Sequence, residues 1–324
     1  MKYSPVIIPT CNRVNHLEDC LKSLSQNYGA ENTDIYISVD FPPDDRYVDG
    51  WNKVKDYLAN SLDSYSFASI NIKIQGENLG PCENTIYLVN WVKEKHDRYI
   101  LTEDDNVFSK HYLKFVNQAL EMIENEDQIV AVCPYQSNKN VKNSAQIYTL
   151  RYFSSWGSAF LVNDKEKLNS WITNDNILDF AVSIKKMYKF WKYYRGYFNT
   201  LVDGFLYNHV KNFFVEDNRV AVIDVTINMY LCNFDYRSLF PNINYVKNNG
   251  GDGSGINSRV GDWSYDIDDE EVEMDFSQKL KDGNPGDVGK AHNIRGYLRE
   301  IKVIFHYFIW LLFIRKIATS KACD

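Results

Sequence analysis

The chain of 324 residues is 44% hydrophobic and 24% charged, with few Gly and Pro. This composition is typical of a folded globular protein of one large or two modest domains and excludes disorder as a description of the whole. With a net charge of −7 and a pI of about 5.5, the sequence shows no basic patch of the kind that binds nucleic acid, so we expect no nucleic-acid partner.

Cysteine usage and the start of the sequence indicate a cytoplasmic protein. Six cysteines are scattered without the short paired spacing of zinc or redox sites, which favours reduced, mostly buried thiols. The apolar stretch "PVIIPT" near the start is too short for a secretory signal and is typical of a first strand. We therefore expect a cytoplasmic location.

Strand and helix patterns alternate over the first 136 residues. Strands are predicted over residues 4–10, 33–40, 70–75, 97–105 and 128–136. Helices are predicted over residues 14–27, 50–62, 83–95 and 111–126. This order predicts βαβ units and an α/β fold with a central, mostly parallel sheet flanked by helices. Ligands of such sheets bind beyond the carboxyl ends of the strands.

Largely polar segments stand at the carboxyl ends of the predicted strands. They contain Pro9, Thr10, Asn12, Arg13, Asp40, Asn78, Gly80 and the acidic run Glu103, Asp104 and Asp105. If the strands are parallel, these ends converge on one edge of the sheet. The sequence thus predicts a crevice that contains a cluster of acidic side chains and is suited to a cation and a phosphate-bearing ligand.

The acidic run "EDD" has two interpretations. Carboxylates at the end of a buried strand are good ligands for Mg²⁺ or Mn²⁺ together with the oxygens of a substrate diphosphate. Alternatively, the acids begin a helix over "DNVFSKHYLKF", where they would cap it and complement its dipole. Taken alone, the run favours the helix start, because short acidic tripeptides are common.

The segment "IKVIFHYFIWLLFIRK" (residues 301–316) is dense in large apolar side chains and has basic residues at both ends. It is shorter than the roughly 20 residues that a membrane span needs. A helix lying in the membrane interface, with its basic flanks on anionic headgroups, is one interpretation. The other is a terminal helix docked on the protein's own core or on a second subunit of a homodimer.

The first third of the chain resembles the nucleotide-sugar-binding half of GT-A glycosyltransferases: "PVIIPTCNRVNHLEDCLKSL", then "ISVD", "ENLG" and an acidic strand end. "TEDD" is similar to the DXD-type metal motif of that fold, in the form found in the N-acetylglucosaminyltransferase I type. The resemblance implies that Asp105 binds Mn²⁺ or Mg²⁺, with Glu103 and Asp104 near the donor sugar and ribose. It also implies a nucleoside pocket lined by Pro9, Thr10, Asn12, Arg13 and Asp40.

The middle of the chain resembles bacterial polysaccharide glycosyltransferases of this type. The matching stretches are "YFSSWGSAFLV", which contains Trp156, then "IDVTINMYL" and "FPNINYVKNNGGDGSGIN". The resemblance implies that Asp224 is the general base that activates an acceptor hydroxyl. A helix N-cap is the alternative role for Asp224, and Asp203 is the rival base. Asn257 stands where relatives often have His.

Together these resemblances imply a GT-A (Rossmann-like) catalytic domain over residues 1–260, with a nucleotide-sugar-binding half at 1–135 and an acceptor half at 136–260. A C-terminal helical extension follows at 261–324. The implied enzyme is an inverting, metal-dependent hexosyl- or N-acetylhexosaminyltransferase of bacterial surface polysaccharide synthesis. It would move a sugar from a UDP-sugar to a glycan or lipid-linked acceptor, peripherally at the inner face of the cell membrane.

Two other functions stay open from the sequence. A sugar-phosphate nucleotidyltransferase has a related fold, but it normally needs a Gly-rich phosphate loop after the first strand, and "PTCNRVNH" contains no glycine. A nucleotide-sugar or glycan-binding protein without catalysis is the non-enzymatic alternative. Metal-dependent hydrolysis of the donor would exclude it.

Overall fold

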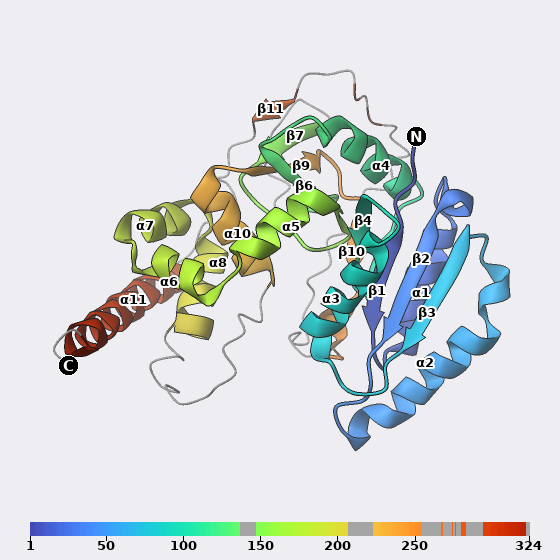
Figure 1. Cartoon of the computed structure of the whole chain (residues 1–324), viewed down its shortest axis with the longest axis horizontal. Coiled ribbons are helices and arrows are strands. Elements are labelled where there is room, and N and C mark those ends of the chain that lie inside the picture. The colour runs from blue at the N-terminus through green and yellow to red at the C-terminus, as the bar shows by residue number, and fades with distance from the viewer. Residues whose placement is uncertain are drawn as a thin grey trace. The chain divides into compact units, whose positions relative to one another are not determined.

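The chain forms two compact units in the computed structural model (Figure 1). The structure describes residues 1–136, 147–206, 223–254, 267, 274, 276, 280–282 and 294–321. Unit 1 consists of Met1–Leu150, Ser154–Glu166 and Arg237–Gly283. Unit 2 consists of Arg151–Phe153, Lys167–Tyr236 and Asn284–Asp324. The domain boundaries expected at residues 135 and 260 stay predictions.

In its described residues, unit 1 is built on a nine-stranded sheet with the strand order β11-β7-β9-β6-β8-β4-β1-β2-β3. Its strands are β1 Val6–Thr10, β2 Asp34–Val39, β3 Ser69–Ile74, β4 Arg98–Leu101, β6 Ile129–Val132, β7 Ile147–Leu150, β8 Ser158–Leu161, β9 Arg237–Pro241 and β11 Lys281–Asp282. The first four strands pair in parallel, while β8 runs antiparallel to its two neighbours. The predicted α/β fold with a mostly parallel sheet is confirmed.

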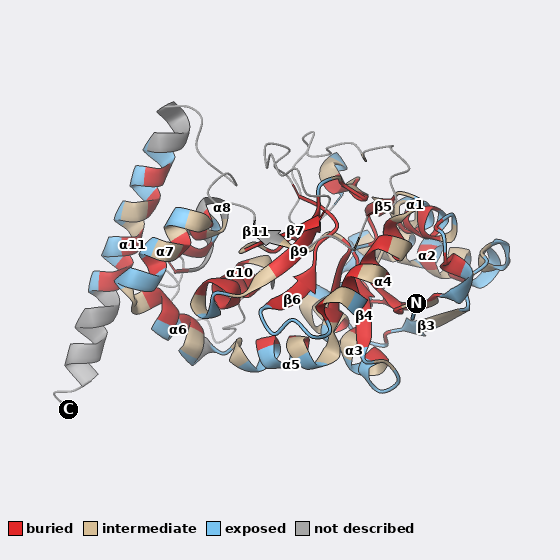
Figure 2. Ribbon diagram, turned by 90° about the horizontal axis from the view of Figure 1, so that it is seen from above, coloured by how far each residue is buried: buried red, intermediate tan, exposed pale blue. Residues whose placement is uncertain are grey.

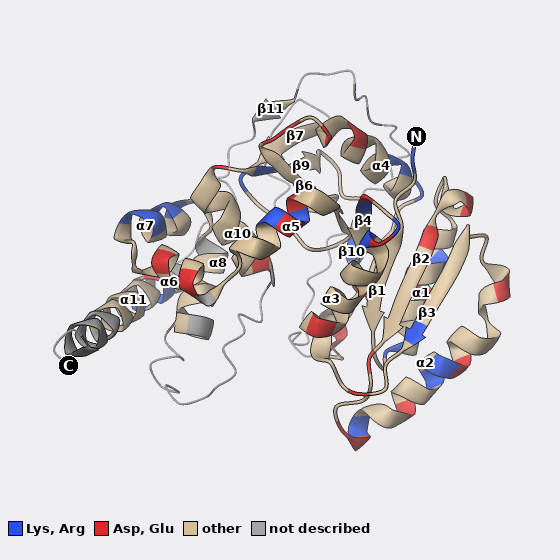
Figure 3. Cartoon of the chain, in the orientation of Figure 1, with Lys and Arg blue, Asp and Glu red and all other residues tan. Residues whose placement is uncertain are grey.

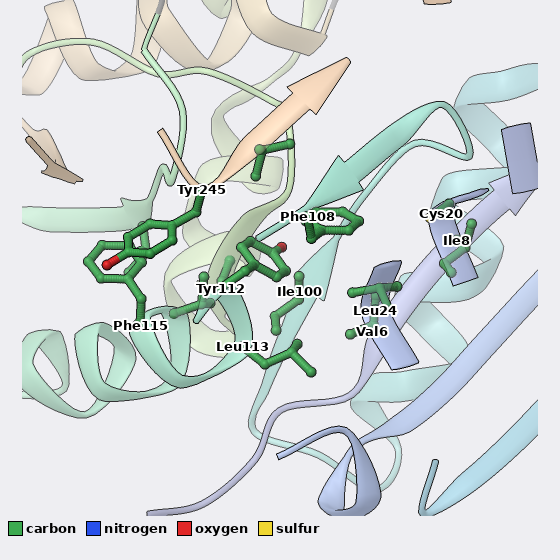
Figure 4. Close-up of a cluster of buried hydrophobic side chains, with 14 of the residues drawn as sticks. Val6, Ile8, Cys20, Leu24, Ile100, Phe108, Tyr112, Leu113, Phe115 and Tyr245 are labelled. Atoms are coloured by element: carbon green, nitrogen blue, oxygen red, sulfur yellow. The ribbon is translucent and has the colours of Figure 1, made fainter. Parts of the chain in front are cut away.

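Helices cover both faces of the first strands because side chains alternate along each strand. The helices of unit 1 are α1 Val14–Ser25, α2 Val48–Asn60, α3 Gly80–Lys93, α4 Tyr112–Ile123 and the first part of α5 Val162–Trp171, which continues into unit 2. Val6 and Ile8 point into a buried cluster that includes Leu113 of α4 (Figure 4). On the neighbouring strand, Tyr36 packs edge-on against Trp91 of α3 at 5.0 Å between ring centroids. Burial on both faces explains the nearly continuous apolar runs of these strands.

A second, two-stranded sheet lies next to the acidic run. It pairs β5 (Asn106–Phe108) antiparallel with β10 (Val246–Asn248), and Asn248 is opposite Asn106. The acids therefore precede a strand, and α4 begins only at Tyr112, so the helix-start interpretation of the acids is wrong. This pairing brings the loop after β10 beside the acids.

Unit 2 is helical around an aromatic core. Its elements are α6 Asn174–Val182, α7 Ile184–Tyr193, α8 Arg195–Asn199, a π-helix at Thr200–Leu206, α10 Ile223–Phe234 and α11 Ile294–Lys321. Phe180, Phe190 and Trp310 are among the buried side chains. The terminal helix is longer at both ends than the 301–316 segment predicted from the sequence. No helix in the described part of the chain has the length and hydropathy of a membrane span.

Candidate functional site

Asp104 and Asp105 follow β4 and are almost fully buried, 3% and 6% exposed. Arg13, in the turn between β1 and α1, binds both carboxylates. Its Nη1 donates to Oδ2 of Asp105 over 2.7 Å and its Nη2 donates to Oδ1 of Asp104. Thr10 Oγ1 donates to the other oxygen of Asp104 over 2.6 Å. A single guanidinium therefore offsets part of the charge of two neighbouring carboxylates.

Burial dominates the electrostatics of this group. Burial raises the pKa of Asp104, although Arg13 opposes the shift. Burial alone would lower the pKa of Arg13, but the two carboxylates outweigh it and raise that pKa above its usual range. Burial, with Asp40 and Asp104 nearby, raises the pKa of Cys11 to about 11. The raised pKa disfavours the thiolate form of Cys11.

The loop after β10 completes the acidic group. Asn248 Nδ2 donates to Oδ1 of Asp105 over 2.7 Å, and the backbone N–H of Asn249 donates to the carbonyl of Asp105 over 2.8 Å. The N–H of Gly250 in turn donates to Oδ1 of Asn248 over 2.8 Å. Asp105 and Asn248, which these contacts join, are 143 residues apart in the sequence. Both oxygens of Asp105 consequently have a donor within the protein.

A side chain at position 250 is expected to disturb this group. A Cβ on Gly250 would lie 2.4 Å from Oδ2 of Asp105, whereas one on Gly76 would meet nothing within 4 Å. We expect Gly250→Ala to lower the free energy of unfolding by about 1–3 kcal/mol through overpacking. Denaturant unfolding measures the loss. Gly76→Ala is the matched control, and an equal response of both variants would contradict the predicted clash.

Asp40 holds the start of α3 at the end of β2. Its Oδ1 accepts from the N–H of Leu79 and its Oδ2 from the N–H of Gly80, each over 2.8 Å. Gly80 has a φ of +76°, a conformation that favours glycine. The Nδ2 of Asn78 donates to the carbonyl of Phe41 over 2.6 Å. The structure thus brings together Asp40, Asn78 and Gly80, as the strand-end prediction requires.

Trp156 precedes β8 and lies at the edge of the sheet where β4 ends and the acids follow. In the antiparallel pair Ser158 lies opposite Leu101, so the residues before β8 run alongside the end of β4. The Trp156 ring packs on Tyr135 at 4.3 Å between centroids. Of the other predicted donor residues, Pro9 is in β1, Asn12 is in the following turn and Glu103 is exposed between β4 and the buried acids.

The two candidate bases belong to unit 2. Asp224 lies in the first turn of α10, where its charge complements the helix dipole, and Tyr197 Oη donates to its Oδ2 over 3.4 Å. Asp203 is in the π-helix, and its side chain lies outside the described residues, as does Asn257. The base assignment stays a prediction.

Sequence reasoning missed Asn248 and a contact between His16 and the glycine-rich loop. His16 Nε2 lies 3.0 Å from Oδ2 of Asp252 and 3.3 Å from Oγ of Ser254. Hydrogen bonds from Ser254, with a smaller effect of His16, lower the pKa of Asp252 to about 2. The sequence signal for this loop is "NNGGDGSG", but nothing in it specifies β5 or α1 as its partner.

The donor chemistry at Asp105 fits a hard divalent cation that also binds a substrate. Magnesium sites commonly use one or two carboxylates and complete their shell with substrate phosphates and water. Within the described residues, no group of three or more His, Cys, Asp and Glu side chains could hold a metal ion. Asp104 and Asp105 are carboxylates of this kind, and a metal ion would have to compete with Arg13 for their oxygens.

Comparison with solved structures finds matches that include S. aureus TarS and a mannosyltransferase. S. aureus TarS matches at 14% identity over 52% of this chain and 30% of that chain, with a TM-score of 0.35. TarS 1-349 in complex with UDP-GlcNAc matches at 17% identity over 51% and 47%, with a TM-score of 0.36. The mannosyltransferase PcManGT from Pyrobaculum calidifontis, in complex with GDP-Man and Mn2+, matches at 13% identity over 52% and 46%, with a TM-score of 0.37.

The chain spans less than half the length of each of these three matched chains. No protein-family model and no curated protein match the sequence. Matches with TM-scores below 0.5 carry no functional argument, so the activity of this chain is inferred from its own residues.

Proposed function

We propose that this chain is a glycosyltransferase that moves a sugar from a nucleoside-diphosphate donor, most readily a UDP-sugar, to a glycan or lipid-linked acceptor. The observation that carries the proposal is the convergence of the polar ends of β1, β2 and β4 around a buried pair of carboxylates. Ligands of parallel sheets bind at this edge. A hexosyl or N-acetylhexosaminyl donor of bacterial surface polysaccharide synthesis is the proposed class.

The proposed donor site uses residues of unit 1. Asp105 would hold Mn²⁺ or Mg²⁺, which when bound stabilises the charge of the departing nucleoside diphosphate. Arg13 is the nearest cation to the acids and, once released from them, can pair with phosphate oxygens. Asp40 fixes the turn at residues 78–80, so this part of the proposed donor site keeps its shape. Trp156 offers a ring for stacking on the donor.

The proposed reaction is a direct displacement with inversion. Asp224 removes the proton of an acceptor hydroxyl as that oxygen forms a bond to the anomeric carbon and the bond to the diphosphate breaks. Asp203 is the rival base. Loss of the carboxylate that serves as base lowers transfer, while donor binding in unit 1 is kept.

Titration of nucleotides into the protein tests the proposal. UDP, GDP, dTDP and CMP are added in a calorimeter, once with Mn²⁺ and once with EDTA. We expect one nucleoside diphosphate to bind at least tenfold more tightly with Mn²⁺, and the corresponding nucleotide-sugar to be hydrolysed slowly with the metal present. Binding without hydrolysis or transfer would assign a non-catalytic binding protein. Absence of binding for all four would overturn the donor site.

A further inference from the structure

The terminal helix α11 has two apolar faces with different surroundings. Val303, Tyr307 and Trp310 are buried in the core of unit 2, and the hydroxyl of Tyr307 donates to the carbonyl of Ala181 over 2.9 Å. Figure 2 shows that buried and exposed residues alternate along the described part of this helix. One face of α11 is therefore part of the fold of unit 2.

The other face carries large apolar side chains that remain in solvent. Their exposed fractions lie between 37% and 68%. They are Leu298, Ile301, Phe305, Phe308, Ile309 and Leu312. Spacings of three and four residues place them on one stripe of the helix, which we call the α11 stripe. Six exposed apolar side chains on one stripe indicate an interaction surface, whereas single exposed apolar residues are common on any protein.

The charges within α11 itself are almost all positive. The helix contains six Lys and Arg residues and a single acid, Glu300, which is buried. Arg299 and Lys302 are exposed beside the stripe. Unit 2 as a whole has 16 Lys and Arg against 10 Asp and Glu, whereas unit 1 has 20 against 33.

A further basic helix belongs to the same unit. In α7, Lys185, Lys186 and Lys192 are exposed together with Ile184 and Tyr188. Figure 3 shows the basic residues of α7 in blue and no acidic residue on this helix. The segment Ile184–Tyr193 contains no acid. Unit 2 thus combines exposed apolar and basic side chains on two of its helices, in a chain whose net charge is −7.

We propose that the α11 stripe docks on an anionic lipid surface and lies in the interface without crossing it. Exposed apolar side chains with basic neighbours are the features that bind a helix to acidic headgroups. A second copy fits less well, because a symmetric contact would set two identical basic helices against each other. The α11 stripe belongs to unit 2 and shares no residue with the proposed donor site in unit 1. If the acceptor is lipid-linked, as proposed, docking on the membrane would bring the enzyme close to it.

Vesicle sedimentation of the full chain tests this docking. Phosphatidylcholine vesicles are compared with vesicles containing about 30% phosphatidylglycerol. We expect binding to the anionic vesicles only, and at least a tenfold loss of that binding in Phe305→Glu with Leu312→Glu. Ile86→Glu is the matched control because Ile86 is also an exposed apolar helix residue, 47% exposed, but in unit 1. Arg299→Glu with Lys302→Glu should weaken binding to the anionic vesicles and make that binding less sensitive to salt.

Three results would overturn the docking. The first is the absence of binding of the unaltered chain to anionic vesicles, and the second is equal binding by the stripe variant, which carries Phe305→Glu and Leu312→Glu. The third is a dimer in light scattering that the stripe variant abolishes, since a second copy would then be the occupant. Nucleotide titration of the same variants reports on the donor site separately, because Phe305 and Leu312 belong to unit 2.

Discussion

Asp105→Asn is expected to reduce sugar transfer by about a hundredfold to a thousandfold, the usual effect of removing one group that stabilises transition-state charge. The asparagine keeps the size of the side chain but removes the negative charge that a divalent cation requires. It also replaces one acceptor oxygen by an NH₂ group. Arg13 and Asn248 each donate to one oxygen of Asp105, so one of these two hydrogen bonds is lost. The readouts are turnover of a labelled nucleotide-sugar and the Mn²⁺ dependence of nucleotide binding.

Asp34→Asn is the matched control for this change. Asp34 begins β2, at the opposite end of the strand from Asp40, and accepts a hydrogen bond from Ser69. We expect this variant to keep both activity and Mn²⁺-dependent binding. If Asp105→Asn also kept them, the carboxylate of Asp105 would be only a structural partner of Arg13, and the metal assignment would be wrong.

Arg13→Met is expected to lower the free energy of unfolding by about 3–5 kcal/mol, the typical cost of removing one partner of a buried ion pair. The methionine fills part of the space but leaves Asp104 and Asp105 without their shared cation. Denaturant unfolding at pH 7 measures the loss. We further expect Mn²⁺ to raise the melting temperature of this variant more than that of the unaltered protein, since the ion can replace the lost charge.

Arg46→Met is the control for the loss of an arginine. Arg46 pairs with Asp44 on the surface, and its side chain is 82% exposed. Surface pairs contribute little to stability, so this variant should unfold almost as the unaltered protein does. A similar small loss in both variants would mean that Arg13 does not neutralise the acids in the folded protein. A metal effect of equal size in both would contradict competition between Arg13 and the cation.

The sequence by itself determined the α/β class and the edge of the sheet at which the candidate site lies. Both follow from local signals, because strand and helix periodicities of neighbouring segments alternate clearly over the first 136 residues. Parallel pairing then puts the ends of β1, β2 and β4 at one edge, as observed for Thr10, Asp40 and Asp104. The residue types at those ends pointed to cation and phosphate chemistry without any long-range information.

Only the tertiary structure decided what surrounds the acids. Pairing of β5 with β10 depends on residues about 140 positions apart, and both strands are three residues long, too short for a periodic signal. Asn248 and Gly250 are therefore invisible as partners of Asp105 in the sequence. The terminal helix shows the same limit. Apolar residues all round α11 could not reveal which face is buried, because packing against unit 2 covers Trp310 and leaves Phe305 exposed.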